Sequence, residues 1–296
     1  MEVSCFRLGN LGFGMTKSKV AIVFPVYNGA KTLERSLQCI AEQDYPDFRA
    51  FILENGSTDD TVEIAKRFCS TDPRFTLISN DVHLNAVDNF AKAVKIGSAA
   101  AEFFCLRACD DMSSENYLSS LIGALENDHS KLLAAGPTTL IAPAGTSRIK
   151  RPSPDIFDFR GRFAKGIVPR NLTFPAEWIY GLFRSDGAEE ILKARWYELG
   201  NPWCFASYVV SEFVIRDLVA YVDDASYHFY EGSGSDKKFG AKTFRERFSQ
   251  RMIYTFGCYK LIQKLPPASA LARARFFRMC WNDARRKTRY KLLWIF

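Results

Sequence analysis

No apolar run in this 296-residue sequence approaches the roughly 18–20 residues that a membrane-spanning helix needs. A secretory signal is also absent, because no basic segment near the start precedes an apolar run and a small-residue cleavage site. A second methionine, Met15, precedes the first strand signal, so residues 1–18 are expected to form a short leader. These absences predict a cytoplasmic protein.

Cysteine pairs and glycine-rich phosphate loops are missing as well. The eight cysteines are scattered without a CxxC motif, which argues against a disulfide framework or a zinc site and favours reduced thiols. Neither GxGxxG nor GxxxxGK(S/T) follows an expected strand. The sequence therefore disfavours both a Rossmann dehydrogenase and a P-loop NTPase.

Most of the chain has no net charge. The formal net charge is +7, and residues 271–296 alone carry eight Lys or Arg and one Asp, so the remainder is close to neutral. A neutral body does not present the basic face that nucleic-acid binding requires. We therefore expect no nucleic-acid partner.

The basic segment at 271–296 has mainly apolar residues on one side of an expected helix, arginines on the other side, and an apolar end. This combination predicts a helix that lies on an anionic membrane surface, peripheral on its cytoplasmic face. The alternative is a helix packed on the rest of the protein with exposed arginines. Phe277, Cys280, Trp281, Ala284 and Thr288 fall on the apolar face, and Arg275, Arg278, Arg285, Arg286 and Arg289 fall on the other side.

What is present is a regular alternation of strand and helix signals. Short apolar runs at 19–24, 49–53, 75–79, 102–106 and 131–135 are separated by apolar residues at helical spacing. Such repeats predict an α/β fold with a mainly parallel open sheet and helices on both faces. The periodicity fails between 142 and 171, as in a long loop or lid. Residues 241–296 are expected to be helical, with a break at Pro266-Pro267.

Polar residues gather where the expected strands end, which is where open parallel sheets bind ligands. Tyr27 follows the first strand, Glu54 and Asn55 follow the second, and Asp110 and Asp111 follow the fourth. Paired carboxylates supply the oxygen ligands that hard divalent cations prefer. Capping of the next helix is the alternative role for the two aspartates.

Three motifs in this order resemble the family 2 glycosyltransferases of the GT-A fold. They are Phe24-Pro-Val-Tyr-Asn28, Leu53-Glu-Asn-Gly-Ser-Thr-Asp-Asp-Thr61 and Ala108-Cys-Asp-Asp111. Tyr180-Gly-Leu-Phe-Arg184 is similar to a segment in the second half of that family. The resemblance implies an inverting transfer of a sugar from a nucleotide diphosphate donor, with UDP as the expected nucleotide. The acceptor would be a hydroxyl of a glycan or lipid-linked molecule in cell-surface polysaccharide synthesis.

The resemblance also implies domain limits. Residues 19–235 would form the GT-A catalytic domain, with a nucleotide-sugar half at 19–141 and an acceptor half at 142–235. Residues 236–296 would be a helical, basic extension.

Roles for the donor-side residues follow from the same resemblance. Pro25, Tyr27 and Glu54 or Asn55 would line the pocket for the base and ribose, and Asn89 would lie near the nucleotide. Asp111 would bind Mg²⁺ or Mn²⁺, which stabilises the negative charge of the departing diphosphate, and Asp110 would contact the sugar or ribose. Many family members have a second carboxylate in place of Asn55 and a third acidic residue in place of Cys109.

An inverting transfer also needs a general base for the acceptor hydroxyl. The resemblance places it in the second half, where Glu212 is the candidate and Asp223 and Asp224 are rivals; a solvent-facing helix residue is the alternative for Glu212. His228 is expected to contact the diphosphate or to pack at a strand end. Arg184 is expected to orient the acceptor or phosphate, or to form a structural ion pair.

Two other functions fit parts of the pattern. A nucleotidyltransferase shares the fold class, although Asn28-Gly-Ala-Lys31 is a poor version of its usual loop. A degenerate nucleotide-sugar binder or scaffold is consistent with the departures at Asn55 and Cys109.

Overall fold

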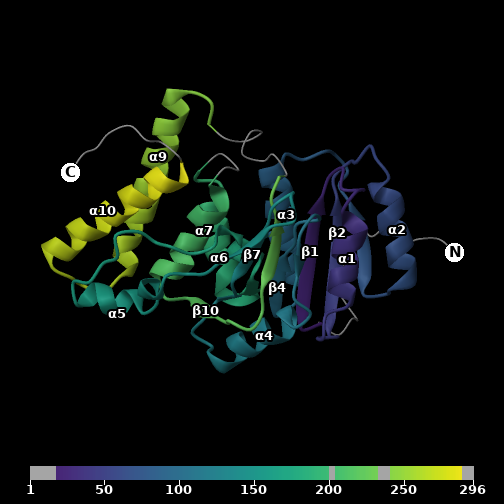
Figure 1. Cartoon of the computed structure of the whole chain (residues 1–296), viewed down its shortest axis with the longest axis horizontal. Coiled ribbons are helices and arrows are strands. Elements are labelled where there is room, and N and C mark those ends of the chain that lie inside the picture. Colours follow the sequence, from purple (N-terminus) through teal and green to yellow (C-terminus); the bar gives the residue numbers. More distant parts are fainter. Residues whose placement is uncertain (1–17, 200–203, 233–240, 289–296) are drawn as a thin grey trace.

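The computed structural model of the chain describes residues 18–199, 204–232 and 241–288 (Figure 1). Over these residues a seven-stranded sheet has the order β10-β6-β9-β4-β1-β2-β3. All its pairings are parallel except those of β9, which runs antiparallel between β4 and β6. The expected mainly parallel sheet is confirmed. Its strands are β1 Val20–Val26, β2 Phe48–Glu54, β3 Phe75–Ser79, β4 Phe103–Leu106, β6 Leu133–Ala135, β9 Leu182–Arg184 and β10 Val219–Tyr221.

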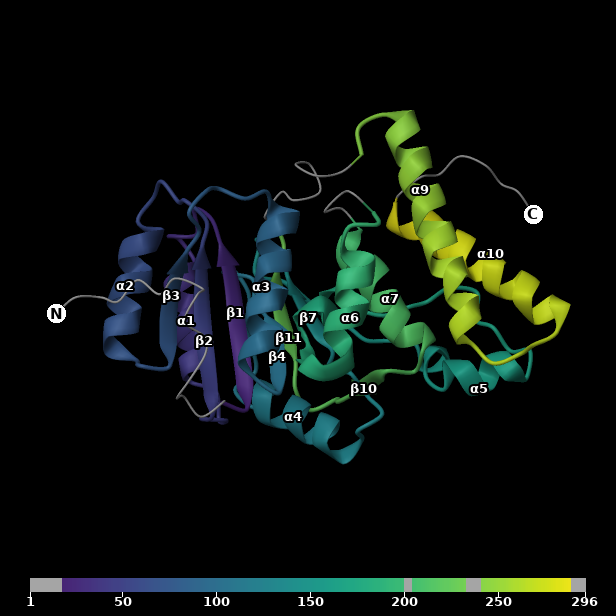
Figure 2. The same cartoon turned by 180° about the vertical axis from the view of Figure 1, so that it is seen from behind.

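Strand β1 is buried on both faces because helices cover the sheet on both sides. Ala21 and Val23 face a core that includes residues of α3, α6 and α7, whereas Val20 and Ile22 pack with α1 and α4. Successive side chains point to opposite faces, so a doubly covered strand needs a continuous apolar run. Figures 1 and 2 show α1 and α3 on opposite sides of the sheet. The helices are α1 Leu33–Ala41, α2 Thr61–Thr71, α3 Ala86–Ala100, α4 Tyr117–Asn127, α6 Ser185–Trp196 and α7 Phe205–Ile215.

A second sheet returns the later part of the chain to the end of β4. Among the described strands its order is β5-β11-β7-β8, and antiparallel pairing of β11 with β5 places Tyr227 opposite Ser113. Because β5 begins directly after Asp111, this pairing brings β11 to the acidic pair. The strands are β5 Met112–Ser113, β7 Thr138–Ile141, β8 Ser147–Lys150 and β11 Tyr227–Tyr230.

The segment at 142–171 contains regular structure that its sequence did not predict. It includes β8 and helix α5 (Phe159–Ala164). β8 forms because it pairs with β7, and α5 forms because Phe159 and Phe163 enter the core. Both are stabilised by contacts with distant residues, so local periodicity does not reveal them.

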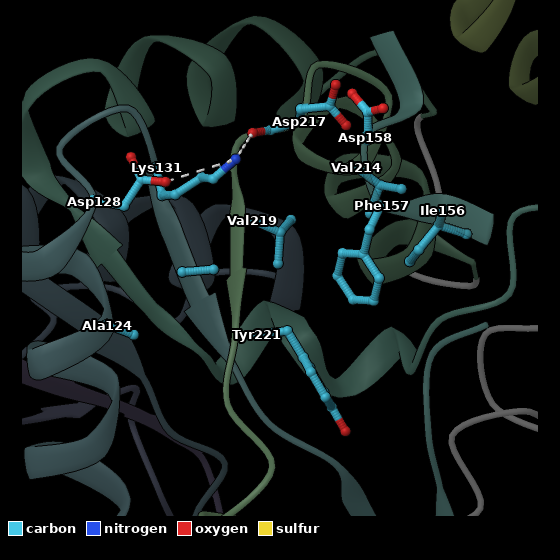
Figure 3. Close-up of a pocket in the computed structure, with 11 residues that line it drawn as sticks. Ala124, Asp128, Lys131, Ile156, Phe157, Asp158, Val214, Asp217, Val219 and Tyr221 are labelled. Atoms are coloured by element: carbon cyan, nitrogen blue, oxygen red, sulfur yellow. Dashed lines mark hydrogen bonds and ion pairs between the residues drawn. The ribbon is translucent and has the colours of Figure 1, made fainter. Parts of the chain in front are cut away.

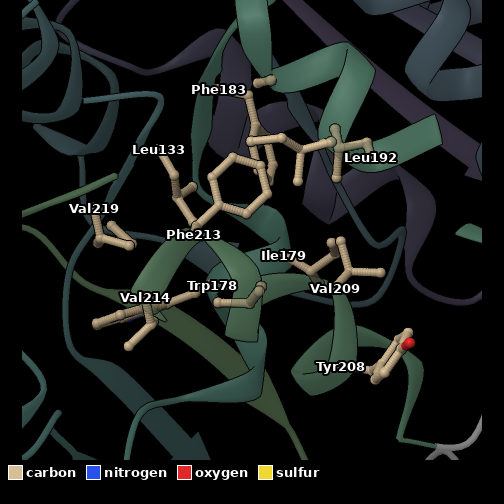
Figure 4. Packing of buried hydrophobic residues seen from close by; sticks show 14 of the residues in the cluster. Leu133, Trp178, Ile179, Phe183, Leu192, Tyr208, Val209, Phe213, Val214 and Val219 are labelled. Atoms are coloured by element: carbon tan, nitrogen blue, oxygen red, sulfur yellow. The ribbon is translucent and has the colours of Figure 1, made fainter. Parts of the chain in front are cut away.

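Helices α9 (Phe244–Tyr259) and α10 (Ala270–Lys287) continue the main core. Tyr254 of α9 and Phe276 of α10 belong to the same apolar cluster as Tyr208 and Phe213 of α7, part of which is seen in Figure 4. No helix among the described residues is both long and apolar enough to cross a bilayer.

Most of the face of 271–296 that was expected to meet a membrane is packed inward, although Phe277 on that face is 37% exposed. Cys280, Ala284 and Thr288 are buried, so the alternative interpretation of a packed helix is correct for these residues. Arg289 and the apolar end lie outside the described residues, as do residues 1–17 of the expected leader.

Candidate active site

The turns that follow β1 and β2 are tied together at the carboxyl edge of the sheet. The Asn28 backbone N–H donates to Ser57 Oγ at 3.0 Å, and Asn28 Oδ1 accepts from the Thr58 N–H at 2.8 Å. The Gly29 N–H donates to Thr61 Oγ1 at 2.8 Å. Asn28 has a φ of 51°, in the left-handed region that asparagine tolerates better than most residues. The first two motifs therefore form one connected rim.

Tyr27 and His83 form an aromatic corner on this rim. Tyr27 is 45% exposed, and its ring meets the His83 ring edge-on with centroids 4.5 Å apart. His83 Nδ1 lies 2.8 Å from the Asn55 carbonyl oxygen. An exposed aromatic face can stack on a nucleobase. His83 was not predicted, because only the packing of the segment after β3 against Tyr27 brings it here.

Asn55 and Asn89 lie beside this corner, but their amides bind other parts of the protein. Asn55 Oδ1 accepts from Asn80 Nδ2 and the Leu84 N–H, both at 2.8 Å, and its Nδ2 donates to the Leu84 carbonyl at 2.8 Å. Asn80 also donates to Asn89 Oδ1 at 2.9 Å, and Lys92 donates to Asn80 at 2.7 Å. This buried network holds the loop that carries His83, and the expected positions of Asn55 in the base pocket and of Asn89 near the nucleotide stay predictions.

Glu54 and Pro25 also support the rim instead of lining it. The buried Glu54 carboxylate accepts a hydrogen bond from the Ser57 backbone N–H. Pro25 is an interior, buried residue of β1 and lies opposite Leu53 of β2. The pocket-lining roles expected for these two side chains are therefore corrected as well.

Asp111 is an anchoring residue at the junction of the two sheets. It is 1% exposed, and its carboxylate accepts from the Tyr227 hydroxyl at 2.9 Å and the Tyr230 N–H at 3.0 Å. Burial, followed by the charge of Asp110, raises the pKa of the Asp111 carboxyl to about 7. Both oxygens are occupied and solvent is excluded, so the expectation that Asp111 is the direct metal ligand is corrected.

Asp110 is the more accessible of the two aspartates. Its side chain is partly exposed, and its backbone carbonyl accepts from Arg35 at 3.4 Å. Burial raises the pKa of the Asp110 carboxyl, while its own backbone N–H and the charge of Arg35 act in the opposite direction. Arg35 itself lies over the Tyr230 ring, 4.4 Å from its centroid. Of the two carboxylates, Asp110 is thus the one open to solvent.

The carboxylate chemistry of Asp110 and Asp111 suits a divalent cation. Burial raises the pKa of both Asp110 and Asp111, and the charge of Asp110 adds to the shift at Asp111. A bound cation would favour the ionised form of both carboxyls. Carboxylate oxygens are the ligands that Mg²⁺ and Mn²⁺ prefer. No group of three or more acidic, histidine or cysteine ligands occurs in the described residues. A cation here would therefore need Asp110 together with oxygens of a bound donor.

Residues 21–176 match the protein family described as "Glycosyl transferase family 2", and the match covers more than half of the chain. The chain belongs to this family. The resemblance expected from the three motifs is thereby confirmed.

Curated relatives match a shorter part of the chain. An uncharacterized glycosyltransferase of Haemophilus influenzae is 24% identical over 111 residues, which are 37% of this chain and 34% of the relative. Glycosyltransferase GlyG of Streptococcus pneumoniae is 28% identical over 102 residues, which are 34% of this chain and 33% of the relative. The chain thus matches about a third of the length of these relatives.

Two solved structures share the fold. TarS 1-349 of S. aureus, in complex with UDP-GlcNAc, has a TM-score of 0.61 at 13% identity, covering 90% of this chain and 72% of TarS. The mannosyltransferase PcManGT of Pyrobaculum calidifontis, in complex with GDP-Man and Mn²⁺, has a TM-score of 0.55 at 16% identity, covering 89% and 69%. These likenesses confirm the expected GT-A fold.

Arg107 is a buried residue next to Tyr227, whose hydroxyl donates to Asp111. It is fully buried, and none of its guanidinium nitrogens has a hydrogen-bond partner among the described residues. The guanidinium instead lies over the rings of Tyr227 and Tyr117, 4.8 Å and 5.7 Å from their centroids. Tyr180 stacks on the Tyr227 ring with centroids 5.1 Å apart. Tyr227, which holds Asp111, is therefore fixed on two sides.

Glu212, the expected base, belongs to an ion-pair network in the core. Its buried carboxylate lies 3.6 Å from Arg195 and 2.9 Å from Arg216. It occupies the later part of α7, which leads into the amino end of β10. Since β10 runs parallel to β6, Glu212 lies toward the sheet edge opposite Asp110. The structure therefore corrects the assignment of Glu212 as the base.

Asp223 and Asp224, the rival candidates, follow β10 at the carboxyl edge of the sheet. Asp223 pairs with Arg151 and accepts from the Tyr221 hydroxyl at 2.8 Å, and its side chain is 64% exposed. Asp224 accepts from the Ser120 hydroxyl at 3.1 Å. Asp223 is thus an accessible carboxylate on the expected side of the sheet.

Arg184 and His228 do not join the acidic pair. Arg184 pairs with Glu102 at 3.5 Å and lies opposite Phe103, at the amino end of β4, so its structural alternative is the correct one. His228 Nε2 lies 2.8 Å from Ser226 Oγ, and burial lowers the pKa of its imidazole. It follows Tyr227 in β11 and so points to the other face of that strand. The strand-packing alternative holds for His228.

A separate pocket of about 350 Å³ lies beside the edge strand β10 (Figure 3). Phe157 and Tyr221 form its apolar side, and Lys131 crosses its rim to donate to the Asp217 carbonyl at 2.7 Å. Asp217 in turn accepts from the first backbone N–H groups of α5. The residues expected from the sequence to form the active site do not line this pocket.

Proposed function

We propose that the chain is a metal-dependent glycosyltransferase that moves a sugar from a nucleoside diphosphate donor to a hydroxyl of a glycan or lipid-linked acceptor. One observation carries the proposal: the partly exposed Asp110 lies at the same sheet edge as the exposed Tyr27 corner. This arrangement on one edge suits a ligand with a base at one end and a diphosphate at the other. Membership in family 2 supports glycosyl transfer over nucleotidyl transfer.

The donor is proposed to be a UDP-sugar bound along this edge. TarS was solved with UDP-GlcNAc and PcManGT with GDP-Man and Mn²⁺, which supports a nucleotide-sugar for a chain of this fold. The Tyr27 ring would cover one face of the base, while the buried Asn55 network keeps the His83 loop in place behind it. We propose a role in cell-surface polysaccharide synthesis for the same reaction.

Asp110 would hold the cation against the donor phosphates, and Asp111 would keep the acidic turn in position. Mg²⁺ or Mn²⁺ bound there would act as a Lewis acid that stabilises the charge of the leaving diphosphate. Tyr227, which packs on Arg107, would hold Asp111 and with it one end of the acidic turn in place. This preorganisation matters because electrostatic stabilisation works only when the charged groups are already in place.

The acceptor hydroxyl must lose a proton as it attacks the anomeric carbon with inversion. We take Asp223 as the proposed base. Both Asp223 and Asp224 are exposed after β10, but only the Asp223 carboxylate is paired with Arg151 and bound by the Tyr221 hydroxyl. Asp223→Asn is expected to lower kcat by a factor of roughly 10² or more, as loss of a general base does, with little change in donor binding. Asp224→Asn is the matched control and should keep near wild-type turnover. Equal loss in both variants would remove Asp223 from this role.

A thermal-shift panel of nucleotide sugars with and without Mn²⁺ tests the donor and the cation together. A donor at about 100 times its Kd stabilises the folded protein by about 2.7 kcal/mol, which is easily measured. Asp110→Asn is expected to abolish the Mn²⁺-dependent part of the shift while leaving the melting temperature of the free protein near wild type. Full Mn²⁺ dependence in Asp110→Asn would refute the assignment of the ligand.

A nucleotide-sugar binder without transferase activity is the second candidate. The observation in its favour is that Glu212 is engaged in structural ion pairs. If this candidate is correct, a donor should raise the melting temperature as expected, but no sugar should be transferred to any acceptor. Asp223→Asn should then have no effect on either measurement.

A further inference from the structure

Helices α9 and α10 expose large apolar side chains at the end of the molecule farthest from α2 (Figure 1). Ile253 and Phe256 of α9 are 37% and 46% exposed, and Leu271 and Phe277 of α10 are 60% and 37% exposed. The Phe256 and Phe277 rings lie together, with centroids 6.2 Å apart, so the exposure continues from one helix to the other. We call these four residues the apolar patch.

Exposed basic side chains occur in the same helical region as the apolar patch. Lys260, directly after α9, and Arg273 and Arg278 of α10 are exposed. The one acidic residue of α10, Asp283, is 2% exposed and contributes no negative charge to the outer surface. The outer face of α10 therefore combines apolar and cationic groups.

The buried inner face of α10 holds this helix against the core. Ala272, Phe276, Met279, Cys280 and Ala284 are buried against the core. Leu271, Arg273 and Arg278 are exposed outside this packing. Exposed apolar residues that lie together, as Phe256 and Phe277 do, mark interaction sites in soluble proteins.

We propose that the apolar patch and its basic border form a docking surface for an anionic lipid bilayer. The side chains of Ile253, Phe256, Leu271 and Phe277 would enter the boundary between headgroups and acyl chains, and the arginines would pair with anionic headgroups. An acidic polymer such as a nucleic acid would satisfy the charges but not the aliphatic side chains. The surface keeps Phe277 of the face expected from the sequence, whereas Cys280 and Ala284 of that face are buried. It does not depend on the proposed transfer reaction, although it would bring the site to lipid-linked acceptors.

Flotation of the full chain with lipid vesicles tests the proposal. The protein should float with phosphatidylcholine vesicles that contain about 30% phosphatidylglycerol but not with phosphatidylcholine alone, and binding should weaken as salt shortens the screening length. Equal partitioning into both kinds of vesicle, or into neither, would overturn it.

Two variants separate the apolar and cationic contributions. Phe256→Ser with Phe277→Ser, and Arg273→Glu with Arg278→Glu, are each expected to lower the vesicle partition coefficient by roughly tenfold or more. Ile149→Ser on β8 and Lys66→Glu on α2 change exposed residues elsewhere and are the matched controls. Melting temperatures identify any variant that fails to fold, and the salt series on the wild type remains decisive in that case.

The outcomes also distinguish a bilayer from other polyanions. If the arginine pair alone affects binding, and duplex DNA competes with the anionic vesicles, the surface is a polyanion site and the proposal fails. If the control variants lose as much binding as the patch variants, the attraction is a property of the whole molecule and the proposal also fails.

Discussion

At the residue scale, burial decides which of two adjacent aspartates is available for chemistry. Asp110 and Asp111 have the same side chain and neighbouring positions, yet Asp111 is 1% exposed and bonded to two residues of β11. Its high pKa reflects the cost of placing a carboxylate there. An acidic motif in a sequence therefore locates a site, but it does not tell which of its carboxylates is available to bind a cation.

Glu212 illustrates the same point for an ion pair. Replacing Glu212 with Gln leaves the buried Arg195 with Glu198, 3.9 Å away, as its remaining acidic partner. Breaking buried pairs costs about 3–5 kcal/mol. We expect a lower free energy of unfolding in urea but an unchanged kcat per folded molecule. Glu189→Gln breaks an exposed pair with Lys193 and is the control, with an expected loss of about 0–1 kcal/mol. Unchanged stability with lost turnover would restore Glu212 as the base.

At the scale of the element, α10 is held by close packing and one buried carboxylate. Asp283 Oδ2 accepts from the Leu172 N–H at 2.9 Å. Burial raises the pKa of the Asp283 carboxyl to about 7, although the charge of Lys287 acts in the opposite direction. α9 completes this packing, since a Cβ at Gly257 would collide with the Tyr208 hydroxyl. The position of α10 therefore depends on a small residue at Gly257 and on an uncharged carboxyl at Asp283.

The Asp283 carboxyl makes the docking of α10 sensitive to pH. Its folded pKa of about 7 lies above the unfolded value of about 3.9. Its contribution to stability is therefore complete below about pH 4 and is lost as the pH rises toward 7, by up to about 1.4 kcal/mol per pH unit. Asp283→Asn should show a smaller fall in unfolding free energy between about pH 5 and pH 8 than the wild type. Identical pH profiles in urea unfolding would contradict this account.

At the scale of the whole molecule, the C-terminal helices belong to the same core as the sheet. Tyr254, Leu261, Phe276 and Met279 join one cluster with α7 and the central strands. Burying side chains of this size contributes about 1.5–3 kcal/mol each. The four together are comparable with the total stability of a domain, about 5–15 kcal/mol.

Removal of residues 236–296 should therefore prevent stable folding of the remainder. We expect the truncated chain to lack a cooperative thermal transition and to bind a hydrophobic dye, because it exposes the face of α7 that α9 covers. Circular dichroism melts of the truncated and full chains measure this directly. A cooperative melt of the truncated chain near the wild-type temperature would show that 19–235 is an independent domain.

The parallel sheet, the family and the acidic turn were predictable because they depend on short segments. A buried strand such as β1 needs a continuous apolar run, and a ligand turn needs polar residues directly after it, so both are visible within about ten residues. Arg184 and His228 were harder to interpret. The pairing of β9 with β4 sets the Arg184 contact with Glu102, and the pairing of β11 with β5 and β7 sets the surroundings of His228.

The sequence by itself determined the α/β class, the place of Tyr27 and Asp110 at the carboxyl edge, and the helical character of 244–259 and 270–287. Only the tertiary structure decided that Asp111 is an anchor, that Glu212 neutralises Arg195, and that α10 exposes Phe277 while it buries Cys280 and Ala284. The physical reason is sequence distance: Tyr227 reaches Asp111 across 116 positions. Local periodicity sets which elements form, whereas accessibility and charge pairing depend on which distant elements meet.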